Sequence, residues 1–125
     1  MAKFFISTGA FFAALGILLG AFGAHGLKNR LETHMLEVWH TGVNYHMYHA
    51  LGLIFIGILL HQIGDSSLIK WSGRLMITGI ILFSGSLYLL AFTGIKWLGA
   101  ITPLGGISFI TAWLLLSFAL LRANY

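Results

Sequence analysis

The sequence predicts an all-α integral membrane protein, a four-helix bundle that runs up-down-up-down. Of its 125 residues, 58% are hydrophobic and only 8% are charged, whereas soluble domains carry about 25% charged residues. Four apolar stretches are each long enough for a helix to cross about 30 Å of hydrocarbon. The second and third connections between these stretches are short, and short connections make consecutive helices antiparallel neighbours.

We expect a single domain, residues 1–125, because this length is typical of one folding unit. The spans are expected at residues 4–24, 42–61, 71–92 and 98–121. The first span is longer than the apolar region of a signal peptide, which has about 7–15 residues. We therefore interpret it as a transmembrane helix.

The first connection, residues 25–41, is longer and carries its own pattern. Its apolar residues recur at spacings of four, four and three, as Leu27, Leu31, Met35 and Val38. This pattern predicts a short amphipathic helix that lies on the membrane surface between spans one and two. Asn29 and Glu32 resemble a capping box at its start, and Trp39 is expected to anchor it at the interface. The alternative is a loosely structured polar loop.

The basic residues predict orientation and partners. One side of the membrane would carry Lys3, Lys70, Arg74 and Arg122, and the other would carry Lys28, Arg30 and Lys96. The positive-inside rule then favours cytoplasmic termini in the cell (inner) membrane. Because the chain has no basic run, we expect no nucleic-acid binding. Membrane lipids are the expected partners, since scattered basic residues contact anionic headgroups.

Small residues form a continuous stripe along the first span. They recur at spacings of four, three, four and three, as Gly9, Ala13, Gly16, Gly20 and Gly23. In lipid, small residues allow the close backbone approach that drives helix association. The stripe therefore indicates tight helix packing, within one bundle or between protomers, and we expect a homo-oligomer. A pore or a substrate path is the alternative interpretation.

Two histidines stand where ionisable side chains are costly. His46 and His49 come just before an apolar run, residues 50–60, which is too short to span a membrane unless its helix includes both. Ionisable groups at membrane depth are candidates for function. The antiparallel topology places further polar side chains in the same outer layer. The candidate polar layer comprises His25, Tyr45, His49, Ser84, Ser86, Tyr88 and Thr102.

Three roles for this layer follow from the residue types. The histidines can hydrogen-bond to neighbours and hold the helices together, or His25 and His49 can carry protons or ions. Haem or metal binding would need His25 opposite His49, or further ligands such as Glu32. The chain has no cysteine and only three acidic residues, and it lacks the common catalytic motifs. We therefore expect no enzymatic activity, no cofactor and no metal site.

Four segments resemble the signature of one family. They are GAFGAHGLK (residues 20–28), WHTGVNYHMYHALGL (39–53), LFSGSLYLLAFTG (82–94) and LGAITPLGG (98–106). In this order they are similar to the domain of unknown function 423 family, the YgdD/YwdK-like small four-helix inner-membrane proteins. The resemblance covers nearly the whole chain. It implies four transmembrane helices in the bacterial cell membrane, and it carries no activity, substrate or cofactor.

The resemblance also selects residues within the segments. The matching positions are His25, Trp39, Tyr45, His49, Ser84, Gly85, Ser86, Tyr88, Thr102, Pro103 and Gly106. His46 is not among them. We therefore expect His49 with His25 to be the important pair, and we interpret His46 as an interfacial neighbour.

Overall fold

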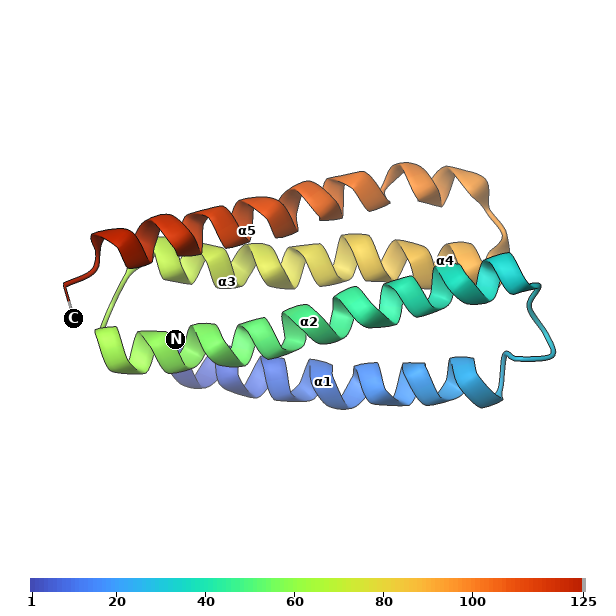
Figure 1. Ribbon diagram of the computed structural model, residues 1–125, viewed down its shortest axis with the longest axis horizontal. Coiled ribbons are helices and arrows are strands. Elements are labelled where there is room, and N and C mark those ends of the chain that lie inside the picture. Colours follow the sequence, from blue (N-terminus) through green and yellow to red (C-terminus); the bar gives the residue numbers. More distant parts are fainter. Residues whose placement is uncertain (125) are drawn as a thin grey trace.

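A computed structural model describes residues 1–124, which form four antiparallel helical spans with both termini at the same end (Figure 1). The first two spans are α1 (Ala2–His25) and α2 (Thr33–Ile63). The third is built from α3 (Ser67–Gly79), a π-helical turn (Ile80–Ser84) and α4 (Gly85–Thr93). A 3₁₀ helix (Lys96–Ala100) leads into α5 (Thr102–Arg122). All four spans are long and apolar enough to cross a membrane, so the predicted all-α four-helix architecture is confirmed.

The expected surface helix between spans one and two is corrected by the structure. Residues 26–32 form turns and bends, and the chain becomes helical at Thr33, as the first turns of α2. Glu32 precedes α2 without capping it through its side chain. The 31 residues of α2 span about 46 Å, more than the hydrocarbon thickness. Residues 33–41, expected on the surface, are therefore the first turns of the second span.

The apolar stripe of this segment packs into the protein instead of the headgroup region. Leu27 is 1% exposed and Trp39 is 4% exposed, and they form a small cluster with Ala91 of α4. The Trp39 indole N–H donates to the Leu19 carbonyl oxygen at 2.9 Å. Trp39 is thus a buried link between α2 and α1, which corrects its expected role as an interfacial anchor. Burial against two helices removes more apolar surface from water than lying at the interface does.

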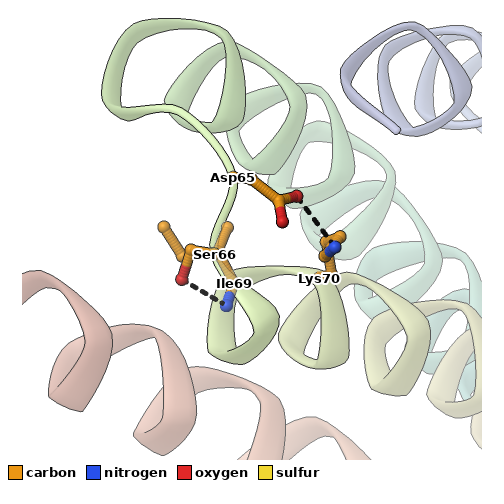
Figure 2. Close-up of polar contacts among 4 residues, drawn as sticks. All are labelled: Asp65, Ser66, Ile69 and Lys70. Atoms are coloured by element: carbon orange, nitrogen blue, oxygen red, sulfur yellow. Dashed lines mark hydrogen bonds and ion pairs between the residues drawn. The ribbon is translucent and has the colours of Figure 1, made fainter.

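The turn between α2 and α3 is tight and polar (Figure 2). Gly64 adopts a φ of +96°, which glycine accepts without a steric penalty. The Ser66 hydroxyl caps α3 by accepting the Ile69 backbone N–H at 3.3 Å. The Lys70 ammonium lies 2.8 Å from the Asp65 carboxylate. These contacts reverse the chain within a few residues, so α2 and the third span become antiparallel neighbours.

The bundle has two apolar clusters with polar side chains between them. The larger cluster lies toward the termini and consists of Phe5, Leu53, Ile56, Leu60, Ile69, Met76, Ile80, Phe109, Ala112, Leu116 and Ala119. The smaller one, Leu27, Trp39 and Ala91, closes the opposite end. Along α2 the buried residues His46 and His49 lie between these clusters. The exposed Glu32 and Glu37 lie beyond the smaller cluster, so apolar side chains separate them from the histidines.

The small residues of α1 face α2 within the same chain. A methyl group added at Gly9 would lie 2.6 Å from the Ala50 carbonyl oxygen, and one added at Gly20 would lie 3.3 Å from a Val43 methyl. Gly16 faces the Met47 side chain, Gly23 faces Trp39, and Ala13 is half-buried. The stripe therefore lets the α1 and α2 backbones approach closely, as expected for helix packing in lipid.

Candidate functional site

The buried polar side chains gather near the middle of the bundle. His46 and His49 are only 2% and 4% exposed. His49 lies 16 residues after Thr33, which is about 24 Å along a helix of about 46 Å. Both histidines are therefore near mid-depth, and His46 is not the interfacial residue that we expected. The difference arises because α2 begins nine residues before the span predicted to start at Gly42.

His46 joins three spans. Its Nε2 lies 2.7 Å from the Phe12 carbonyl oxygen of α1, and its Nδ1 lies 2.9 Å from the Tyr88 hydroxyl of α4. A carbonyl oxygen can only accept, so Nε2 must carry the proton. In the neutral ring, Nδ1 then accepts the Tyr88 hydroxyl proton. The His46 side chain thus ties α2 to α1 and α4 through two hydrogen bonds.

His49 has the opposite tautomer and joins α2 to α5. The Trp113 indole N–H donates to its Nε2 at 2.9 Å. Its Nδ1 lies 2.7 Å from the Tyr45 carbonyl oxygen and must donate to it. The ring also stacks on Phe109, with centroids 3.5 Å apart and planes 9° apart. An indole has only a donor, so protonation of Nε2 would set two N–H groups against each other.

Hydroxyl groups of the third span complete the layer. Ser84, at the end of the π-helical turn, donates to the Gly42 carbonyl oxygen of α2 at 2.7 Å. Ser86 donates to the Phe83 carbonyl oxygen at 2.9 Å, and the Thr102 hydroxyl lies 2.6 Å from Ser86. Since the Ser86 proton is engaged, Thr102 is the donor in that pair. The π-helical turn thus sits where α2, α4 and α5 exchange polar contacts, and such turns are frequent at functional sites.

Six of the seven predicted site residues lie in or beside this layer. Ser84, Ser86, Tyr88 and Thr102 make hydrogen bonds between spans. His49 does the same, and Tyr45 supplies its carbonyl acceptor. His25 is different, because it is exposed at the end of α1, 13 residues beyond Phe12. The structure therefore does not bring His25 to His49.

Sequence reasoning missed two members of the layer. His46 lies outside the family motifs, although its spacing of three from His49 predicts a shared side of the helix. Trp113 is the second member; it is 42% exposed, and its indole N–H bonds to the buried His49. Its position was the available signal, since it lies in the middle of its span and not at either end, where tryptophan usually anchors.

The layer is a closed set of hydrogen bonds. Within residues 1–124, every buried side-chain nitrogen or oxygen has a hydrogen-bond partner. In the same part of the chain, no three His, Asp or Glu side chains gather as metal ligands would. A satisfied polar network in a low-dielectric interior rigidifies the helices that it joins. Chemically, the arrangement is suited to locking four spans in one register.

The sequence profile of the family described as Protein of unknown function (DUF423) matches residues 19–106. The chain belongs to this family. The UPF0382 membrane protein YwdK of Bacillus subtilis (strain 168) is 51% identical over 120 residues, which cover 96% of this chain and 98% of YwdK. The UPF0382 membrane protein SH2409 of Staphylococcus haemolyticus (strain JCSC1435) is 50% identical over 115 residues, 91% of this chain and 92% of the relative. No solved structure matches the chain.

The DUF423 match contains much of the polar layer. Residues 19–106 include His46, His49, the π-helical turn, Tyr88 and Thr102. Phe109 and Trp113, which hold the His49 ring, lie just beyond it. The two relatives are named as membrane proteins and not by a reaction. Together with four apolar spans, this establishes a multi-pass membrane protein of the DUF423 family.

Proposed function

We propose that the protein is a structural, non-enzymatic component of the cell membrane that works as a homo-oligomer. The observation that carries the structural role is the closed hydrogen bonding of the central layer, in which the His46 and His49 tautomers are both determined by their partners. Neither imidazole has a free nitrogen to offer a passing ion. In this role the layer holds the register of the spans, and the lipid-facing surface makes the contacts with neighbours.

The outer face of α1 supports self-association. This helix packs mainly on α2, and the opposite side of α1 is exposed along its length. Small residues follow the first half of that side at helical spacing, as Ser7, Ala10 and Ala14, before the exposed Ile17 and Leu18. A second copy could approach closely along this line, because small residues permit the backbone contacts that stabilise helix pairs in lipid.

Replacing a small residue by a large one tests this interface. We expect Ala14→Leu to lower the oligomeric mass measured by light scattering in detergent, because leucine would hold the two backbones apart. Ser117→Leu is the matched control, since Ser117 is an exposed small residue on α5. An unchanged mass in Ala14→Leu, or a monomeric parent protein, would contradict self-association through α1.

Proton transport through His25 and His49 is the competing function, and two alanine variants separate it from the structural one. We expect His49→Ala to lower the unfolding temperature, because the Trp113 N–H loses its partner, whereas His25→Ala leaves it unchanged. Liposomes loaded with a pH-sensitive dye should show the same proton leak with parent and variant proteins. A stable His49→Ala protein that abolishes a proton flux of the parent would overturn the structural role.

The proposed cytoplasmic termini rest on the basic residues at each end. Lys3 and Arg122 lie at the start of α1 and the end of α5, and Lys70 and Arg74 lie in the first turns of α3. These helix ends lie at the end of the bundle that holds the termini (Figure 1). The chain contains no cysteine, so single cysteines can report sidedness. In intact cells, a membrane-impermeant maleimide should label Asn29→Cys and spare Asn124→Cys. The reverse pattern would place the termini outside.

A further inference from the structure

Two apolar hollows flank the third span on its lipid-facing side. One has a volume of about 270 Å³ and lies between α1 and the third span, bordered by Phe12, Leu15, Leu19, His46, Ile81 and Tyr88. The other has a volume of about 460 Å³ and lies toward the start of α5, bordered by Leu82, Ser86, Tyr88, Leu89, Leu98 and Ile101. The larger volume falls within the range of small-molecule sites, about 300–1,000 Å³.

Gly85 joins the two hollows. It borders both of them, and a methyl group built at Gly85 would meet no atom within 4 Å. Ile81 and Leu89, one turn to either side, are 60% and 55% exposed. Gly85 therefore forms a notch in the ridge between two projecting side chains. The adjoining π-helical turn ends at Ser84, directly before this notch.

A polar pair borders the same space. The His46 Nε2 proton is committed to Phe12, and the Tyr88 hydroxyl proton is committed to His46. The hydroxyl oxygen of Tyr88 keeps a lone pair, because a phenol can both donate and accept. A ligand group that meets this pair without breaking it must therefore donate a hydrogen bond. A hydroxyl meets this requirement, whereas a carbonyl or an ether oxygen does not.

We propose that this groove binds a long-chain alcohol dissolved in the membrane. The hydrocarbon chain fills the two hollows and crosses the third span over Gly85, and the hydroxyl donates to the Tyr88 oxygen. The apolar border supplies contacts for the chain, and the Tyr88 oxygen selects its head. Straight-chain and isoprenoid alcohols share this chemistry. The site is independent of self-association, because it lies on the third span and not on the outer face of α1.

Photolabelling of the reconstituted full-length protein tests the proposal. The probe is hexadecanol with a mid-chain diazirine, in vesicles of dioleoylphosphatidylcholine. We expect saturable labelling of peptides that contain residues 81–89. Unlabelled hexadecanol should compete about five- to tenfold better than its methyl ether, the selectivity of one hydrogen bond. Geranylgeraniol as a second competitor shows whether an isoprenoid or a straight chain fits better.

Two glycine variants locate the site. Gly85→Leu fills the notch and should abolish saturable labelling, whereas Gly106→Leu on α5 should retain it. Gly106 is a suitable control because a methyl group there meets only the Phe83 ring, at 3.9 Å. Unfolding temperatures establish that both variants are folded. Labelling that does not saturate, or equal competition by alcohol and methyl ether on the parent protein, overturns the proposal even if Gly85→Leu fails to fold.

Discussion

Replacing Gly9 by alanine should destabilise the protein although alanine favours helices. A methyl group at Gly9 would lie 2.6 Å from the Ala50 carbonyl oxygen and 2.9 Å from the Ile54 backbone nitrogen. Heavy atoms in contact prefer about 3.5–4.0 Å, so the overlap approaches 1 Å. Both neighbours are backbone atoms of α2, and no side-chain rotation can relieve the overlap. The two helices must therefore separate near this contact.

The size of the effect follows from that separation. A gap of about 0.5–1 Å forfeits about a quarter to a half of each dispersion contact along the interface, and overpacking of this kind costs about 1–3 kcal/mol. Alanine returns up to about 1 kcal/mol through helix propensity. We expect a net loss of about 1–2 kcal/mol for Gly9→Ala. For Gly20→Ala we expect a small gain, because only a Val43 methyl at 3.3 Å must adjust.

The assay is reversible unfolding in mixed detergent micelles, followed by circular dichroism, for the parent and both variants. Gly20→Ala is the matched control, since both glycines lie on the same stripe of α1 and gain the same helix propensity. The informative quantity is the difference in unfolding free energy between the variants, about 1–3 kcal/mol, because the helix propensity cancels and the overpacking cost remains. Equal free energies for the two variants would refute close backbone contact between α1 and α2 at Gly9.

Three further predictions concern the polar contacts. Trp113→Phe removes the donor to His49 Nε2 and should cost about 1–3 kcal/mol, the penalty for an unpaired buried acceptor; an unchanged unfolding free energy would argue against the bond. Ser72→Ala removes a buried hydroxyl that donates to α5; urea or detergent titration should show a loss of about 0.6 kcal/mol and no more than about 1.7, the range for such bonds in membranes. The hydrogen bond and charge of Lys70 hold the pKa of Asp65 below its ordinary value, so the pair stabilises the fold above the ordinary carboxyl range near pH 4 and this contribution is lost as pH falls through the folded-state pKa. Thermal scans should therefore show that acid lowers the unfolding temperature less in Asp65→Asn than in the parent. An equal decrease in both proteins would contradict the ion pair.

The surface helix shows where periodicity alone is insufficient. The spacing of Leu27, Leu31 and Met35 indicates an amphipathic helix, but the same pattern suits a helix at the membrane surface and one that packs on protein. In the structure, residues 26–32 turn and Trp39 is buried. The choice depends on whether α1 and α4 offer a surface to cover, which is a tertiary property. The sequence of residues 25–41 alone does not determine whether that surface exists.

The polar layer was predictable in its residue types and not in its pairings. Depth arguments brought Ser84, Ser86, Tyr88 and Thr102 to a common region, because antiparallel spans place them at related heights. They could not pair Tyr88 with His46, since that contact depends on the rotation of each helix about its axis. Rotation by one residue is about 100°, enough to move a side chain from the core to the lipid.

The sequence by itself determined that this chain spans a membrane four times and that its first helix can pack closely. Apolar length and residue size decide those properties, because a bilayer requires about 20 apolar residues per helix and close contact requires small side chains. Only the tertiary structure decided that His46 and His49 bond to Tyr88 and Trp113 at mid-depth, while His25 stays at the end of α1. Hydrogen bonds act over about 3 Å, so the rotation and offset of the helices select the partners.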